Sequence, residues 1–381
     1  MTDTLLGKGQ FGVVTLAYFK APRKYPGWNI LDKVPSKFNT LTAKAVAVKT
    51  IRLANLLISA HQHNLQANNN NNGVDATDTN NRSDQDENVV GYNELTEMLV
   101  EARLMAMLEH PHLVRLVAVC SNYLPVLLVM EYCRHGNLLQ YLREHRSTFE
   151  QSRDVLSICT DMAVQIATGI EYLHSKLCIH RDLAARNVLV TDLPLAMGRP
   201  SNVLLKLADL GLTRGLHAES DYYRKRSDDA VPIKWQCPRS VTTRIYTTKS
   251  DVYSFGVLLW EIFSLGGVPF AGLTATEAFK LALAGEQLPR PRADMPQPIY
   301  LLQNKCMSRE PASRPTMTTV AQLLRDMLTG LQTQSSRLAM QDGGGTTLIL
   351  NPTFNNTYPD GSKIVFDEEE SDSGVTEESA L

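Results

Sequence analysis

The residues best suited to carry out chemistry lie close together in one short stretch, residues 180–187. Within it, Asp182 offers a carboxylate, Arg186 a guanidinium and Asn187 a carboxamide. A carboxylate can accept a proton from a hydroxyl, and carboxylate and carboxamide oxygens are suitable ligands for Mg²⁺. Asp209 adds a second carboxylate further along the chain. These residue types therefore allow proton transfer beside a magnesium ion.

A glycine-rich segment lies near the start of the chain, at residues 7–14. Glycines let the backbone approach a triphosphate closely, so that amide N–H groups can face the phosphate oxygens. A simple β-turn and a dinucleotide-binding loop are the alternatives. The second is disfavoured because such a loop opens a helix, whereas a strand pattern follows here at residues 13–17. The candidate nucleotide-binding residues of this segment are Gly7, Lys8, Gly9, Gln10, Phe11, Gly12 and Val14.

Lys49 lies among apolar residues on a predicted strand, at the end of the sequence Val-Ala-Val-Lys. Burying a lysine is unfavourable unless it is paired. This side chain therefore either reaches water from the edge of the strand or has an anionic partner. Glu94, Glu97 and Glu101, on a predicted helix at residues 94–109, are the candidate partners.

Hydrophobic periodicity predicts a strand-rich part followed by a helical part. Runs of β-branched and apolar residues predict strands at residues 5–16, 45–52, 113–120 and 126–131. Apolar residues at helical spacing predict helices at residues 94–109, 138–144, 154–175, 249–264, 275–284 and 316–328. Residues 18–42 are predicted to form a surface insertion. Residues 64–88 are rich in Asn and Asp and are predicted to form a disordered low-complexity insertion.

On the order of these segments, the chain is identified as a member of the protein kinase superfamily, over about residues 5 to 330. The resemblance implies an α+β, two-lobed catalytic domain at residues 1–330. Its N-lobe, residues 1–132, would hold a small antiparallel β-sheet and one main helix, and its larger C-lobe, residues 136–330, would be helical. The acid-rich remainder, residues 331–381, is predicted to be a disordered tail.

The resemblance implies a role for each residue of the predicted catalytic loop, residues 180–187. Asp182 would be the base that orients the attacking hydroxyl, with Arg186 beside it. Asn187 and Asp209 would hold the magnesium ions that accompany ATP.

The resemblance also implies how the nucleotide is bound. Lys49 would contact the α- and β-phosphates of ATP and pair with a helix glutamate. Glu101 is the expected partner, because its spacing from residues 110–114 matches that of the family. The other nucleotide-binding residues that the resemblance implies are Ala47, Met130, Glu131, Cys133 and Leu189.

Three features resemble tyrosine kinases in particular. Ala184 stands where serine/threonine kinases carry a lysine, and residues 232–235 resemble the platform beneath a phenol ring. Tyr222 and Tyr223 resemble the tandem activation-loop tyrosines of insulin-receptor-type kinases. The resemblance implies a signalling protein-tyrosine kinase that transfers the ATP γ-phosphoryl group to tyrosine hydroxyls. It also implies autophosphorylation at Tyr222 or Tyr223, which would order the loop through nearby cations.

The chain departs from the family pattern at two positions. Leu210 replaces the usual phenylalanine, and we expect it to fill the same apolar site. Arg239 replaces a glutamate that would pair with Arg314, so we expect Arg239 to turn to solvent and Arg314 to find another acid, such as Glu310. These departures leave open a weakly active or inactive kinase-fold scaffold that acts through its tail. A serine/threonine or dual-specificity kinase is a further alternative, disfavoured by Ala184 and Arg186.

The composition is that of a soluble globular protein. The 381 residues are 43% hydrophobic and 20% charged, with a net charge of −2, which gives no basis for nucleic-acid binding. No run of apolar residues is long enough to predict a transmembrane segment. The six cysteines are scattered, which predicts free thiols in a reducing compartment. We therefore expect a cytoplasmic location, which includes the intracellular part of a membrane receptor.

Two short patterns in the tail predict protein partners. Residues 351–354, Asn-Pro-Thr-Phe, resemble a variant of the turn that PTB domains bind. The last residues, Ser-Ala-Leu, have the form that PDZ domains bind by strand addition. Both patterns are short enough to arise by chance. The expected partners are protein substrates with tyrosine and, through the tail, PTB- or PDZ-domain proteins.

Overall fold

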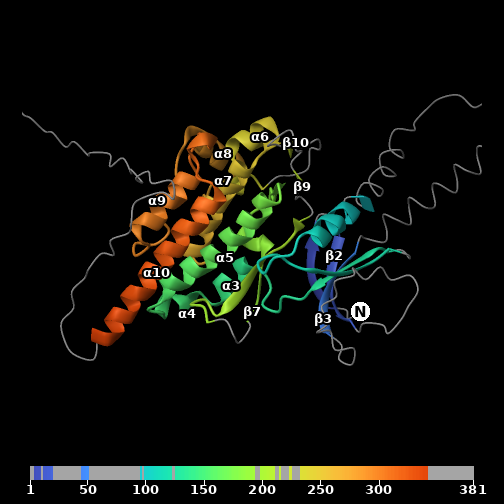
Figure 1. The fold of residues 1–381 in the computed structure, drawn as a ribbon. Helices are drawn as coiled ribbons and strands as arrows, with labels where there is room; N and C mark the ends of the chain where they lie inside the picture. The colour runs from blue at the N-terminus through green and yellow to red at the C-terminus, as the bar shows by residue number, and fades with distance from the viewer. Residues whose placement is uncertain are drawn as a thin grey trace, which may run out of the picture.

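The computed structural model describes residues 4–9, 12–19, 44–50, 95–96, 98–121, 125–193, 198–210, 214–215, 223–224 and 232–341. These residues form two lobes, one built on a β-sheet and one mostly helical (Figure 1). The two-lobed α+β fold predicted from the sequence is confirmed. The insertion predicted at residues 64–88 lies outside the described residues.

The N-terminal lobe is built on a five-stranded antiparallel sheet with the order β1-β2-β3-β5-β4. The strands are β1 Leu5–Gly9, β2 Gly12–Phe19, β3 Lys44–Thr50, β4 Leu116–Cys120 and β5 Leu127–Glu131. Successive side chains of a strand point to opposite faces. On β3, Val46 and Val48 pack with Val129 in a small apolar cluster, so Ala47 and Lys49 face the other side of the sheet.

A helix that includes residues 98–107 packs beside this sheet (Figure 1). Met98, Ala102 and Met105 recur at a spacing of three to four residues and are buried, whereas Leu99 faces outward. Glu101 lies on the buried side of the helix, which brings its carboxylate towards β3.

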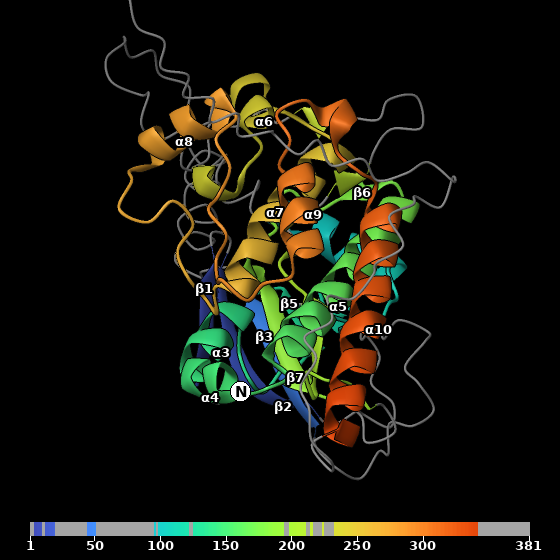
Figure 2. The same ribbon diagram turned by 90° about the vertical axis from the view of Figure 1, so that its left-hand side faces the viewer.

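The C-terminal lobe is organised around two buried helices, α5 Val155–Ser175 and α7 Thr248–Phe263. Helix α10, Met317–Gln341, runs beside α5, as Figures 1 and 2 show, and Arg325 donates a hydrogen bond to Glu171 across this contact. The remaining helices are α3 Leu138–Glu144, α4 Arg146–Gln151, α6 Pro238–Thr243, α8 Ala275–Ala284 and α9 Gln297–Cys306. Among the described residues, no helix combines the length and apolar character needed to cross a bilayer.

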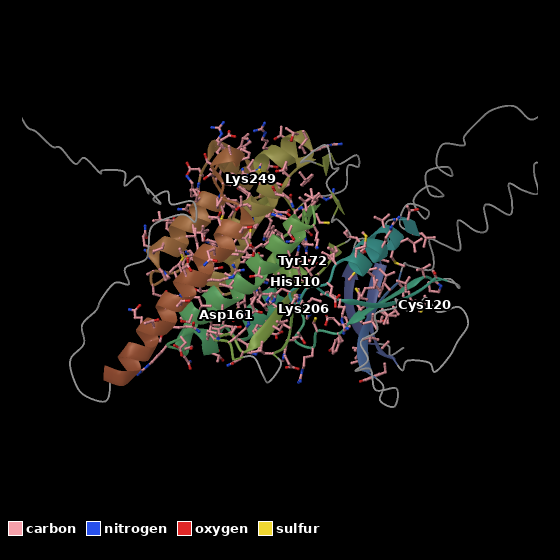
Figure 3. The ribbon with its side chains drawn as sticks, in the orientation of Figure 1. His110, Cys120, Asp161, Tyr172, Lys206 and Lys249 are labelled. Carbon is pink, nitrogen blue, oxygen red and sulfur yellow. The ribbon has the colours of Figure 1, made fainter. Side chains whose placement is uncertain are left out.

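A hairpin of β7 (Val188–Asp192) and β8 (Val203–Leu207) packs against α3 and α5 of the C-terminal lobe (Figure 1). Residues 199–201, just before β8, are held to α5 by Asp161, a buried residue that Figure 3 labels. This carboxylate accepts hydrogen bonds from Arg199, Ser201 and Gln165. The sequence did not predict this hairpin, nor helices α4, α6 and α9, because each is short and lacks a clear apolar period.

The last helix is longer than predicted. We expected it to end near residue 328 and a disordered tail to begin at residue 331, but α10 continues to Gln341. A glycine such as Gly330 costs a helix roughly 1 kcal/mol, whereas burying a leucine contributes about 1.5–3 kcal/mol. Leu331 is buried directly after Gly330, and this burial carries the helix past the glycine. The prediction of disorder is therefore wrong for residues 331–341, and residues 342–381 lie outside the described residues.

Candidate active site

A cavity of about 500 Å³ lies between the two lobes, a size suited to a small-molecule ligand. The predicted nucleotide-binding residues that line it are Gly7, Val14, Ala47, Lys49, Met130, Glu131, Cys133 and Leu189. Lining residues that were not predicted to bind the nucleotide are Leu6, Met105, Val114, Tyr132, Arg134, Gly136, Asn137, Gln140 and Ala208. Glu101, Arg186, Asn187 and Asp209 also line the cavity, so both lobes bring predicted chemical groups to it.

The glycine-rich segment forms the β1–β2 hairpin above this cavity. Gly9 pairs with Gly12 and Lys8 with Val13, so the chain turns back within two residues. Gln10 and Phe11, at the turn, lie outside the described residues, and the contact of this loop with phosphate stays a prediction.

Lys49 forms a buried ion pair with Glu101. Its Nζ lies 2.6 Å from Oε2 of Glu101 and 3.9 Å from Oδ1 of Asp209. The side chains of Lys49 and Glu101 are nearly inaccessible to solvent, whereas that of Asp209 is 43% exposed towards the cavity. The structure thus joins β3 to the helix of the N-terminal lobe through the residue pair expected from the sequence. Glu94 and Glu97, the other candidates, lie outside the described residues.

Asp182 is held in place by two neighbours in the predicted catalytic loop. Arg186 donates a hydrogen bond to its Oδ1 at 2.6 Å, and the Asn187 amide donates to its Oδ2 at 2.6 Å. The short 3₁₀ helix η1, Ala185–Asn187, presents both donors on the same side. Because the Asn187 nitrogen is used in this way, its side-chain oxygen is the atom left to bind a metal. The loop therefore orients this carboxylate through both of its oxygens.

The backbone before Asp182 is anchored by Asp251 on α7. The carboxylate of Asp251 accepts hydrogen bonds from the N–H groups of His180 at 2.8 Å and Arg181 at 3.0 Å, and from the His174 ring at 3.1 Å. Burial alone would raise the pKa of Asp251, but the hydrogen bonds from His174 and His180 keep this pKa below its ordinary value. Asp251 is therefore a charged acceptor at neutral pH.

Two site residues adopt left-handed backbone conformations. Arg181 has a φ of 71° and Asp209 a φ of 56°, in a region where a side chain is unfavourable. Such a conformation costs on the order of 1–3 kcal/mol and persists only where the surroundings impose it. After Asp209, Leu210 is 1% exposed and belongs to the same apolar core cluster as Met105 and Leu116. Leucine at this position therefore fills an apolar site, as expected.

The segment that connects the lobes passes along one wall of the cavity. Met130 and Cys133 line the cavity, while Oε1 of Glu131 accepts from the Arg115 N–H and from Lys206 of β8, both at 2.8 Å. Lys206 lies at the junction of the lobes in Figure 3. Burial, and next the charge of Glu131, raise the pKa of the Cys133 thiol to about 12. Lys206 could not be predicted from the sequence, since a lone lysine on a short strand belongs to no motif.

The segment expected to support a phenol ring lies next to the catalytic loop. Trp235, in the 3₁₀ helix η3 Ile233–Trp235, has its ring 4.8 Å from the Arg186 guanidinium, and Lys234 donates to the carbonyl oxygen of Phe270 at 3.0 Å. Tyr223 contributes its backbone to a short β-bridge with Tyr246. Tyr222 lies outside the described residues, and the use of either Tyr222 or Tyr223 as a phosphorylation site stays a prediction.

Arg314 forms hydrogen bonds with backbone carbonyl oxygens and not with the expected acid. Arg239 is exposed on α6, as predicted. Arg314 is buried, and no carboxylate of the described residues lies within ion-pair distance of it, so the predicted pairing with Glu310 is wrong. Its guanidinium donates instead to the carbonyl oxygens of Lys249, Ser308 and Arg309, and lies 5.2 Å from the Tyr253 ring. Backbone carbonyls and an aromatic face replace the missing carboxylate.

Restoring a glutamate at position 239 should stabilise the fold. A hydrogen bond between a carboxylate and a guanidinium contributes about 1.5–3 kcal/mol, so Arg239→Glu is expected to raise the melting temperature by roughly 3–10 °C. Differential scanning calorimetry would measure the change, with Arg239→Gln as the matched variant that removes the cation without adding an anion. Equal melting temperatures for the three proteins would show that the carbonyl ligands already satisfy Arg314 in full.

Two comparisons relate this chain to known proteins. The family described as protein tyrosine and serine/threonine kinase matches residues 87–324. Fibroblast growth factor receptor 1 of Pleurodeles waltl is 39% identical over 245 residues, which cover 61% of this chain and 28% of that receptor. The chain thus spans little more than a quarter of the length of this curated relative.

Proposed function

Because the chain belongs to the protein tyrosine and serine/threonine kinase family, we propose that it is a protein-tyrosine kinase, which transfers the γ-phosphoryl group of ATP to tyrosine hydroxyls of protein substrates. The position of Arg186 carries this proposal. Its guanidinium donates a hydrogen bond to Oδ1 of Asp182 at 2.6 Å and lies 4.8 Å from the Trp235 ring. One side chain thereby links the proposed base to the segment expected to support a phenol.

The proposed reaction uses side chains that are already oriented. Asp182 accepts the proton of the substrate hydroxyl while the hydroxyl oxygen attacks the γ-phosphorus of ATP. Arg186 and Asn187 each hold one oxygen of Asp182, so little reorganisation is needed when the substrate binds. Lys49, kept in place by Glu101, would balance negative charge on the phosphates.

Asn187 and Asp209 suit a magnesium ion by the chemistry of their donor atoms. Both line the cavity, and both offer the oxygen ligands that Mg²⁺ prefers. Among the described residues, no group of three or more His, Cys, Asp and Glu side chains could hold a metal ion. We therefore expect ATP phosphates and water to complete the ligand set. Bound Mg²⁺ would supply positive charge at the phosphate oxygens.

The preference for tyrosine is supported by Ala184. Its methyl side chain is fully buried and offers no ammonium group to the substrate. The lysine that serine/threonine kinases carry at this position would offer one. The relative described as a growth factor receptor supports a role in signal transduction. Autophosphorylation at Tyr222 or Tyr223 would then regulate the segment between Asp209 and residue 232.

We extend the proposal to the organisation of the chain. The catalytic domain would run from residue 1 through the end of α10, with the lobes divided near residues 132–136. The tail that follows would recruit PTB- or PDZ-domain proteins. The cytoplasm, which supplies ATP, would be the site of action, including as the intracellular part of a membrane receptor.

A second candidate function is a kinase-fold scaffold with little or no activity. The observation that favours it is the pair Arg239 and Arg314, since a glutamate that would link the activation segment to the helical lobe is absent. The Lys49–Glu101 pair and the oriented Asp182 favour the active enzyme, because a scaffold has no need of them.

Phosphotyrosine formation by the purified chain tests the proposed function. With Mg-ATP and a tyrosine-rich polymer, we expect phosphotyrosine as the main product of phosphoamino-acid analysis, in both the polymer and the chain. Phosphoserine or phosphothreonine as the main product would support the dual-specificity alternative. Binding of ATP without any transfer would support the scaffold.

A further inference from the structure

Helix α7 supplies two buried carboxylates to the backbone of the catalytic loop. Asp251, near its start, accepts the N–H groups that precede Asp182. Glu261, ten residues later on the same helix, accepts the N–H of Ala185 through Oε2 at 2.9 Å. Glu261 is 1% exposed, so this bond is shielded from water.

Ala185 occupies a sensitive position in the loop. It is the first residue of η1, the short helix that contains Arg186 and Asn187. These two side chains hold Asp182, each at 2.6 Å. The hydrogen bond from Ala185 to Glu261 therefore fixes the start of the turn that aims both donors at the base.

The charge of Glu261 lies among cations of other elements. Arg186 of η1 and Arg143 of α3 are the cationic groups whose charges act on it. Burial raises the pKa of Glu261 to about 7, and the Ala185 N–H, the Trp235 indole and the charges of these arginines oppose that rise. An apolar side chain, or a neutral amide, would avoid this cost of burial, so a carboxylate at this place calls for a reason beyond stability.

We propose that Glu261 is a positioning residue for phosphoryl transfer. Its carboxylate holds the Ala185 N–H, so that Arg186 and Asn187 keep Asp182 aligned with the substrate hydroxyl. Because the inference concerns the rate of transfer, it rests on the proposed kinase activity. It adds a second carboxylate of α7, after Asp251, to the support of the catalytic loop.

The way in which the free energy of unfolding changes with pH distinguishes a positioning role of Glu261 from a purely structural role. The folded protein holds the Glu261 proton more tightly than the unfolded chain, whose glutamates have a pKa near 4.5. The contribution of Glu261 to the free energy of unfolding is therefore largest below about pH 4.5. It falls as the pH rises to about 7, and stays low above that value. At neutral pH the charged carboxylate thus adds less to the free energy of unfolding than its protonated form does at low pH, which favours a role other than stability.

Glu261→Gln tests the inference, since it keeps shape and an acceptor oxygen but removes the charge. We expect kcat to fall about 10-fold to 100-fold, as for a misaligned catalytic group, while KM for ATP stays within about twofold. The melting temperature at pH 8 should equal or exceed that of the wild type. The wild-type kcat should also rise through pH 7, and this limb of the profile should be absent from the variant. Glu286→Gln, at an exposed position after α8, is the matched control.

Amide hydrogen exchange of residues 180–188 adds a readout that needs no activity. We expect faster exchange there in Glu261→Gln than in the wild type, with α7 itself equally protected. Unchanged kcat and unchanged exchange would overturn the inference, as would a loss of kcat matched by a loss of stability at pH 8. An inactive wild-type chain would refute the proposed function instead, and exchange alone would then decide whether Glu261 positions the loop.

Discussion

Asp182→Asn is expected to lower the rate of phosphoryl transfer about 10²-fold to 10⁴-fold, the usual contribution of a general base. Asparagine keeps the size of the side chain but cannot accept the substrate proton, and it weakens the charge-assisted bond from Arg186, which is 2.6 Å long in the native protein. ATP should bind with nearly unchanged affinity, because Asp182 is not among the residues that line the cavity. Steady-state kinetics and calorimetric titration with an ATP analogue would measure the two effects.

The matched control for this experiment is Asp326→Asn, at an exposed position of α10. It should have wild-type activity and stability, because surface substitutions usually change stability by less than about 0.5 kcal/mol. If Asp182→Asn transferred phosphate at the wild-type rate, the assignment of Asp182 as the base would be refuted.

Lys49→Met is expected to abolish measurable activity and to destabilise the N-terminal lobe. The substitution leaves Glu101 buried without its cation, and breaking one side of a buried pair costs about 3–5 kcal/mol. A loss of this size should lower the melting temperature by on the order of 10 °C. Thermal unfolding followed by circular dichroism, beside a transfer assay, would test both parts. Lys280→Met, at an exposed position of α8, is the matched control.

A double variant separates the two consequences of losing Lys49. In Lys49→Met/Glu101→Leu neither charge of this pair remains, and replacing a buried pair by apolar residues is often neutral or stabilising. Its melting temperature should therefore return close to the wild-type value, while transfer stays absent. Recovery of activity together with stability would show that the pair only supports the fold.

The Lys49–Glu101 contact illustrates what the sequence could predict. A lysine among apolar residues needs an anionic partner, and the order of motifs along the chain selected one glutamate of three. The pairing across 52 residues followed from a family pattern that fixes the spacing of both elements. Apolar periodicity likewise located the helices at residues 138–144 and 275–284 with their observed bounds, because each forms one continuous local pattern.

The supporting contacts of the site could not be predicted in the same way. Glu131 with Lys206, and Glu261 with Ala185, join segments whose approach depends on how the lobes and helices pack. Each involves an isolated residue with no local motif. Their partners become visible only when β8 and α7 have taken their places in the fold.

Arg314 shows a different limit of sequence reasoning. A buried cation was expected to require an anion, yet three carbonyl oxygens and an aromatic ring surround it instead. Every residue carries a backbone carbonyl oxygen, so the residue types do not indicate which of these oxygens will accept a hydrogen bond. A pattern of side-chain charges alone therefore cannot tell a carboxylate ligand from a carbonyl ligand.

The thiol of Cys133, in the segment that connects the lobes, determines how the cavity would respond to covalent reagents. With its pKa raised to about 12, the fraction present as thiolate at pH 7 is on the order of 10⁻⁵, and the thiolate is the reactive form. An electrophile carried by an adenine analogue would thus meet a neutral, poorly nucleophilic sulfur, even when it is correctly seated. Cys133 can therefore contribute to non-covalent binding of a ligand in this pocket, because it lines the cavity. Its neutral thiol is poorly suited to forming a covalent bond with that ligand.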